Sequence, residues 1–193
     1  MSIHQNVMSA KREITVAAMS ASESNPGNYA LILEDLESRR RIPIIIGAAE
    51  AQAIAIAMEH MQPARPLTHD LLKATIDTLG AQLREVLIHS LVDGVFHAHL
   101  LLQKIDGTTV TLDARTSDAI ALAVRCDAPI FTFENVIDEA GILADSLLAR
   151  QKKGSLAMYS LAELEDLLQK VIDKEDYESA SRIRDYISRR KAE

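Results

Sequence analysis

The stretch QLREVLIHSLVDGVFHAHLLLQKIDGTTVTLD, residues 82–113, decides the fold. Two Asp-Gly pairs, Asp93-Gly94 and Asp106-Gly107, separate three runs that are rich in apolar residues. Asp-Gly between such runs is typical of two-residue type I′ hairpin turns. The stretch is therefore predicted to form a meander of three antiparallel strands. A turn at Asp93-Gly94 predicts the pairs Val92 with Val95, Leu91 with Phe96, Ser90 with His97 and Ile88 with His99.

In this register, one face of the meander is apolar and the other carries histidines. The expected core face contains Leu87, Leu91, Phe96, Leu100 and Leu102. Ser90, His97 and His99 lie on the opposite face. Histidines two residues apart on a strand can bind a metal ion, but there is no obvious third ligand apart from the distant His60 or His89. The favoured interpretation is that His97 and His99 are solvated or lie at an interface.

Further strands and helices are predicted on both sides of the meander. Strands are predicted at residues 11–20, 29–36, 41–46 and 130–133, where apolar residues alternate or cluster. Helices are predicted at residues 48–61, 70–79 and 117–126, where apolar residues recur at helical spacing. Thr68 and Thr116 are the expected N-caps of the second and third helices. The predicted fold class is α+β, with a mixed, largely antiparallel sheet, a meander and three packed helices.

The C-terminal part of the chain is expected to form a separate helical hairpin. Residues 143–155 are interpreted as a linker and residues 156–193 as the hairpin, with helices at 160–173 and 176–190. The predicted apolar stripes are Leu161, Leu164, Leu167, Leu168, Val171 and Ile172 on the first helix, and Tyr177, Ala180, Ile183, Tyr186 and Ile187 on the second. Two helices this short have little core of their own. The hairpin is therefore expected to pack against a second copy or another protein, and the chain to form a homo-oligomer.

Composition narrows the class of protein. The chain has 193 residues, of which 48% are hydrophobic and 25% charged, as expected of a globular protein without a membrane span. Residues 1–140 contain 11 Lys and Arg against 18 Asp and Glu, and the whole chain has a net charge of −7. Nucleic-acid binding is therefore expected to be weak or transient. Cys126 is the only cysteine, which excludes an internal disulfide and is consistent with a cytoplasmic protein.

Three segments of the body resemble the bifunctional nuclease family. They are residues 42–51 (IPIIIGAAEA), residues 65–71 (RPLTHDL) and residues 113–123 (DARTSDAIALA). The resemblance covers residues 11–142. Thr116 stands where the family pattern usually has Pro, and Thr can also start a helix by capping it. The resemblance implies a DNase- or RNase-like activity on nucleic acid.

The tail is similar to the UVR motif. The similarity runs from Leu167 to Ala180 and continues from Ile183 to Ile187. Members of that group use the hairpin for protein–protein association. The resemblance therefore implies a protein partner for residues 156–193.

Two of the shared segments place an Arg ahead of a helix start. Arg65 precedes Thr68-His69-Asp70, and Arg115 precedes Thr116-Ser117-Asp118. Unpaired backbone N–H groups and the helix dipole make such starts anion-binding sites, and Arg adds a bidentate fork for phosphate. Gly47 with Glu50 supplies a third strand-to-helix junction. If the three junctions converge, they form a pocket for a phosphodiester.

In this hypothesis each residue has a role. The predicted phosphate-binding residues are Arg65, Arg115 and Ser117. The predicted catalytic residues are His69, Asp70 and Asp118, with His69 as general acid or base because imidazole titrates near neutral pH. The predicted ligands for Mg²⁺ or Mn²⁺, which favour carboxylate oxygens, are Glu50, Asp70 and Asp118.

A structural interpretation of the same residues stays open. Asp in a first turn stabilises any helix start, and a nearby Arg can simply pair with it. The sequence has no Walker loop, CxxC, Gly-x-Ser-x-Gly or HExxH motif and no recognisable two-metal nuclease constellation. The alternative function is a non-enzymatic oligomeric binding or regulatory module that recruits a partner through the C-terminal hairpin.

Overall fold

A computed structural model of the protein describes residues 9–22, 25–143, 161–173 and 177–192. The chain divides into two units, residues 1–143 and 144–193, and each is described by itself. Nearly all of the predicted linker at 143–155 lies outside the described residues. None of the helices in the described ranges is both long and apolar enough to cross a membrane.

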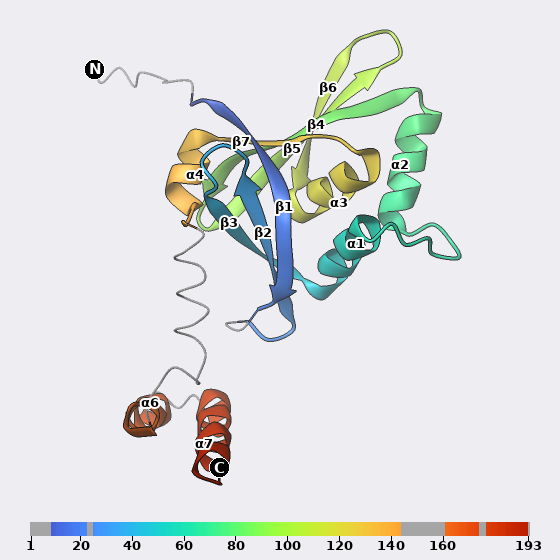
Figure 1. Cartoon of the computed structure of the whole chain (residues 1–193). Helices are drawn as coiled ribbons and strands as arrows, with labels where there is room; N and C mark the ends of the chain where they lie inside the picture. Colours follow the sequence, from blue (N-terminus) through green and yellow to red (C-terminus); the bar gives the residue numbers. More distant parts are fainter. Residues whose placement is uncertain (1–8, 23–24, 144–160, 174–176, 193) are drawn as a thin grey trace, which may run out of the picture. The chain divides into compact units, whose positions relative to one another are not determined.

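The first unit is built on a seven-stranded mixed sheet, which confirms the predicted α+β class (Figure 1). The strands are β1 (Lys11–Ala21), β2 (Asn28–Asp35), β3 (Arg41–Gly47), β4 (Ala81–Val92), β5 (Val95–Lys104), β6 (Thr109–Arg115) and β7 (Ile130–Phe133). Their order in the sheet is β3-β2-β1-β7-β4-β5-β6. Only the β4–β7 pair is parallel. The short strand β7 thus joins the three N-terminal strands to the meander.

Four helices accompany this sheet. They are α1 (Ala48–Met58), α2 (Thr68–Thr78), α3 (Thr116–Cys126) and α4 (Glu134–Ala140). Figure 1 shows α1, α2 and α3 grouped together, and α3 packs on both of its neighbours as well as on β4 and β5. The five consecutive residues 119–123 of α3 are fully buried, and three of them are alanines that permit close packing. Because α3 packs on both α1 and α2, the starts of these three helices come together although α3 lies far from α1 and α2 in sequence.

The meander confirms the first predicted turn and corrects the register beyond it. Asp93 and Gly94 have φ values of 51° and 77°, as a type I′ turn requires. Three predicted pairs are confirmed, but Ile88 faces Ala98 and His99 faces Leu87. A bulge between Ile88 and Ser90 shifts the ladder by one residue. The prediction that Leu87 lies on the core face was therefore wrong, and Val86 and Ile88 are buried there instead.

The second predicted turn was also wrong. Only Gly107 of the Asp106-Gly107 pair has a positive φ, of 83°. The Lys104 N–H donates to the Thr108 carbonyl oxygen at 2.8 Å, which closes a three-residue loop over residues 105–107. In such loops a left-handed residue follows a type I turn. A two-residue turn would place Ala114 opposite His99, whereas in the structure Asp113 takes that position.

The helix starts differ from the prediction by one residue. Leu67 and Arg115 occupy the N-cap positions of α2 and α3, and neither helix has a side-chain cap at that position. The predicted capping roles of Thr68 and Thr116 were therefore wrong, because both residues already lie inside the helix. The Thr116 hydroxyl instead donates to the Phe96 carbonyl oxygen on β5 at 2.9 Å. This bond fixes the start of α3 to the meander.

The first helix is also shorter than predicted. It ends at Met58 rather than Met61. His60 has a φ of 50°, so the chain leaves the helix through the left-handed region. The segment between α1 and α2 is consequently free of helix and contains Arg65.

The described part of the second unit contains two helices, α6 (Leu161–Asp173) and α7 (Tyr177–Ala192), which pack on each other. Leu164, Ile183 and Ile187 form its buried cluster, and Leu168, Val171 and Tyr186 pack around them. Ile172 belongs to the apolar stripe predicted for the first helix but is 41% exposed, so not every residue of that stripe is buried. The side chains of Leu167 and Tyr177 lie outside the described residues. The small size of this cluster agrees with the expected lack of an independent core.

Candidate functional site

Three helix starts surround one hollow of about 410 Å³. The first half of α1 and the first turns of α2 and α3 line it, and its polar lining consists of Glu50, Gln52, Thr68, His69, Arg115 and Asp118. These residues come from segments as far apart in sequence as 50 and 118, and the packing of α3 on α1 and α2 brings them together. The convergence on which the phosphodiester hypothesis depends is therefore present for four of the predicted residues.

Arg115 connects the acidic residues of this hollow. Its Nε and Nη2 donate to the two carboxylate oxygens of Asp118 at 2.7 and 3.1 Å, and its Nη1 donates to Glu50 at 3.1 Å. The hydrogen bonds to Asp118 and Glu50 raise the pKa of Arg115, which stays protonated. The Arg115 side chain is nevertheless 67% exposed. A guanidinium fork therefore lies at the mouth of the hollow and is accessible from solvent.

The glycine before α1 shapes the position of Glu50. Gly47 is the N-cap residue of α1, and the Glu50 carboxylate folds back against it. A Cβ at position 47 would collide with this carboxylate. Gly47 thus leaves the room that allows Glu50 to reach Arg115. The Glu50 side chain is 23% exposed.

His69 completes the arrangement. Its Nε2 lies 3.2 Å from Oδ1 of Asp118, and its side chain is only 13% exposed. When the Asp118 carboxylate is ionised and the imidazole neutral, Nε2–H donates to the carboxylate and Nδ1 carries the lone pair. An oriented imidazole of this kind can accept or deliver a proton.

Asp70, the other predicted acid, has different partners. Its Oδ1 accepts a hydrogen bond from Nε of Arg125 at 2.6 Å, and its Oδ2 accepts one from the Leu67 backbone N–H at 2.8 Å. The Arg125 bond, followed by the Leu67 bond, lowers the pKa of Asp70. Asp70 does not line the hollow. Its geometry is that of a helix-start acid that also holds a buried arginine.

Arg125 is a residue that sequence analysis missed. Its side chain is 6% exposed. Besides Asp70 on α2, Nη1 reaches the carbonyl oxygens of Ala53 on α1 at 3.0 Å and of Ala121 on α3 at 2.9 Å. Arg125 therefore connects the three helices whose starts form the hollow. Its position in the last turn of α3 gave no signal of these long-range partners.

The two remaining predicted phosphate ligands lie elsewhere. Arg65 is exposed on the segment between α1 and α2 and does not line the hollow. Ser117 lines a different hollow of about 520 Å³, beside β3 and the Gly94 end of β5, which Arg115 also lines. The structure thus brings Glu50, His69, Arg115 and Asp118 together, but does not add Arg65, Asp70 or Ser117 to them.

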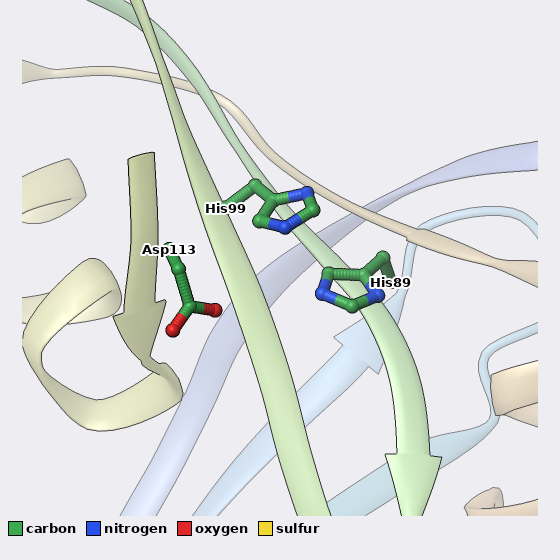
Figure 2. Close-up of side chains that lie close together, drawn as sticks. All are labelled: His89, His99 and Asp113. Atoms are coloured by element: carbon green, nitrogen blue, oxygen red, sulfur yellow. The ribbon is translucent and has the colours of Figure 1, made fainter. Parts of the chain in front are cut away.

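A second cluster is formed by His89, His99 and Asp113. Sequence analysis considered His97 with His99, and His89 as a distant third ligand, but not Asp113. These side chains come from the adjacent strands β4, β5 and β6, and Figure 2 shows them close together. One potential metal-ligand atom from each lies within 4.8 Å of the others. The imidazoles of His89 and His99 are stacked, with ring centroids 4.0 Å apart. This group could hold a metal ion. The bulge at 88–90 and the three-residue loop at 105–107 create it, and both were mispredicted.

The chain matches the model of the bifunctional nuclease domain over residues 31–145 and that of the UvrB/uvrC motif over residues 159–193. The first match covers more than half of the chain. The chain therefore belongs to the bifunctional nuclease domain family. The second match coincides with the helical hairpin of α6 and α7.

Individual proteins similar to this chain include bacterial and plant sequences. An uncharacterized protein of Mycobacterium tuberculosis is 41% identical over 113 residues, which are 58% of this chain and 66% of that protein. Bifunctional nuclease 2 of Oryza sativa subsp. japonica is 30% identical over 122 residues, 62% of this chain and 38% of that protein. Bifunctional nuclease 1 of Arabidopsis thaliana is 35% identical over 91 residues, 46% of this chain and 28% of that protein. The chain thus spans less than two thirds of each relative.

Proposed function

We propose that the protein is a metal-assisted phosphodiesterase that cleaves DNA and RNA at the hollow between α1, α2 and α3. The observation that carries this proposal is the gathering of Arg115, Asp118, His69 and Glu50 around one solvent-accessible hollow. Membership of the bifunctional nuclease domain family and the names of the plant relatives support the same activity.

Arg115 is the proposed phosphate-binding residue. It is the N-cap residue of α3, a helix whose first turn leaves backbone N–H groups unpaired. A phosphodiester that enters the hollow meets both the fork and the helix dipole. Because the fork is held by Asp118 and Glu50, its position is set before the substrate arrives.

Asp118 and Glu50 are the proposed metal ligands. Both carboxylates line the hollow, and carboxylate oxygens are the ligands that Mg²⁺ and Mn²⁺ prefer. Such an ion, when bound, would supply charge neutralisation at the phosphate and a polarised water.

His69 is the proposed general acid or base. Asp118 lies within hydrogen-bond distance of its imidazole, and the side chain is only 13% exposed. An imidazole held in this way can take a proton from water or give one to a leaving oxygen. We assign Asp70 to positioning, because its two carboxylate oxygens are engaged by Arg125 and by the Leu67 N–H.

The test is a nuclease assay on the purified full chain. Single-stranded DNA, double-stranded DNA and RNA are incubated with Mg²⁺, with Mn²⁺ or with EDTA. We expect cleavage that needs the divalent ion, and a loss of about 100-fold or more for Arg115→Ala and His69→Ala. Arg65→Ala is the matched control, because this arginine lies outside the hollow. If the Arg115 and His69 variants cleave as well as the parent, the proposed roles are wrong.

We further propose that the C-terminal hairpin recruits a protein partner or a second copy of the chain. The observation behind this role is the small buried cluster of α6 and α7, with only three side chains at its centre among the described residues. The match to the UvrB/uvrC motif supports it. Removing residues 155–193 should abolish association, measured by light scattering or pull-down, and leave the body folded. Association that survives the truncation would assign this role to the body instead.

A further inference from the structure

We propose that His89, His99 and Asp113 form a binding site for a zinc-class transition-metal ion, separate from the hollow between α1, α2 and α3. The site consists of two imidazoles and one carboxylate on neighbouring strands. It is independent of the proposed nuclease activity, because none of its three residues lines that hollow.

The first argument is geometric. The register places Asp113 directly opposite His99, and the bulge between Ile88 and Ser90 brings His89 onto the same face (Figure 2). The three ligand atoms lie within 4.8 Å of one another. In a tetrahedral zinc site with bonds of about 2.0–2.2 Å, ligand atoms are roughly 3.3–3.6 Å apart. Binding therefore requires side-chain rotations that bring the three atoms closer together.

The second argument is an unsatisfied nitrogen on His89. Nε2 of this residue is buried and has no hydrogen-bond partner among the described residues. Nδ1, by contrast, lies 3.0 Å from the Ser90 hydroxyl oxygen. When Nδ1–H donates to Ser90, Nε2 carries its lone pair, which is the form that a metal binds. A buried polar atom without a partner is unfavourable, and a metal ion at this position satisfies it.

The Ser90 contact also acts as an outer-shell interaction. Metal-binding histidines almost always donate their other N–H to an oxygen, which fixes the tautomer and the ring orientation. The stacking of the His89 ring on His99, at 25° between planes, limits its rotation further.

The third argument concerns the identity of the ion. Imidazole ligands favour zinc and its neighbours in the transition series, whereas Mg²⁺ prefers sites made of oxygen only. Three protein ligands leave a fourth position, and the exposure of Asp113 opens the cluster to solvent. The domain therefore combines an imidazole-rich site on the sheet with an all-carboxylate site at the helix starts.

The location gives this ion a structural consequence. The ion would link β4, β5 and β6 across the sheet, at the level where Asp113 pairs with His99. Arg115 lies two residues after Asp113 on β6, which in a strand is a separation of about 7 Å, and it pairs with His97. Metal binding is therefore expected to fix the end of β6 from which Arg115 extends.

The test is metal binding by the full chain after treatment with a chelator. Calorimetric titration with Zn²⁺ should give one tight site per chain with micromolar affinity or better. Co²⁺ should give the ligand-field absorption of a low-coordinate nitrogen and oxygen site. His99→Ala and Asp113→Asn should each weaken Zn²⁺ binding by about 100-fold or more. Mg²⁺ should not compete at a large excess.

Controls separate this site from other metal-binding groups. His60→Asn removes a histidine of the α1–α2 segment, and Asn tolerates the positive φ at that position. This variant should bind Zn²⁺ as the parent does. Because His99→Ala truncates a half-buried residue of the sheet, the Zn²⁺-dependent rise in Tm is compared for all variants, and Asp113→Asn changes only an exposed side chain. Unchanged Zn²⁺ affinity and Tm shift in Asp113→Asn and His99→Ala would overturn the proposal.

Discussion

The starts of α2 and α3 share the order Arg, Thr, Asp along the chain, but the two Asp residues have different partners in the structure. At α2, Asp70 accepts hydrogen bonds from the Leu67 N–H and from Arg125, whose side chain is 6% exposed. At α3, Asp118 is held by Arg115, whose side chain is 67% exposed, and by His69. One acid belongs to an internal connection between helices, and the other lies at an open hollow.

The difference shows how far a local motif determines a role. An Asp in the first turn is favourable at both helices for the same electrostatic reason. The partner that arrives from elsewhere in the chain decides the rest. Arg125 reaches Asp70 from the far end of α3, and His69 reaches Asp118 from α2. The same packing of α2 on α3 therefore creates the structural pair and the candidate site.

The largest effect on folding is expected from Arg125→Met. The change removes the bond to Asp70 and the bonds to the carbonyl oxygens of Ala53 and Ala121. Because Asp70 remains partly hydrated, we expect the free energy of unfolding to fall by about 2–3 kcal/mol, measured by urea denaturation. Arg65→Met, at an exposed arginine, is the control. A loss no greater than that of the control would contradict the role of Arg125.

Asp118→Asn, unlike Arg125→Met, should lower activity and leave stability nearly unchanged. It removes the charge that holds the Arg115 fork and orients His69. We expect kcat/KM for nucleic-acid cleavage to fall by about 100-fold, with less than about 1 kcal/mol lost in unfolding free energy. Steady-state cleavage and urea denaturation of the same preparation measure both quantities. If Asp118→Asn kept its activity but lost stability, Asp118 would have the structural role that we assign to Arg125.

Asp70→Asn should give an intermediate effect that depends on pH. We expect a loss of about 1–2 kcal/mol at neutral pH, because one hydrogen bond to a charged donor weakens. Since the folded state lowers the pKa of Asp70 below 3.8, its ionised form contributes stability above that value. That contribution is lost as the pH falls through the lowered pKa. Parent and variant should therefore converge in acid urea denaturations, and a constant difference at all pH values would contradict this.

The smallest effect is expected from Arg65→Ala. This arginine is exposed and lies outside the hollow, although its sequence context matches that of Arg115. We expect cleavage within about twofold of the parent and unchanged stability. A loss comparable to that of Arg115→Ala would mean that the α2 start also binds the substrate.

Local signals predicted much of the fold and less of the site. Apolar periodicity gave the strands and the three helices, and the Asp93-Gly94 turn gave the first half of the meander register. Asp-Gly at 106–107 fits both a two-residue turn and the last part of a three-residue loop, and the choice moves Asp113 to the other face. The histidines gave a local signal for a metal site, but the grouping of His89 and His99 with Asp113 depends on that choice and on a bulge.

For the candidate site, the sequence predicted some of the residues that come together but not their partners. The segments that resemble the bifunctional nuclease family directed attention to Glu50, His69, Arg115 and Asp118, which the structure brings together. Sequence proximity placed Arg65, Asp70 and Ser117 with them, but Arg65 lies outside the hollow, Asp70 pairs with Arg125, and Ser117 lines the other hollow beside Arg115. No local pattern could show that Arg125 would donate a hydrogen bond to Asp70.

The most direct test of the contrast between the two helix starts is kcat/KM per folded molecule for Arg115→Ala and Arg125→Met. Cleavage is measured with Mn²⁺ at a temperature well below the Tm of both variants. We predict a loss of about 100-fold or more for Arg115→Ala and less than about threefold for Arg125→Met. Equal losses, or a larger loss for Arg125→Met, would contradict the assignment of the α3 start as the phosphate-binding end of the hollow.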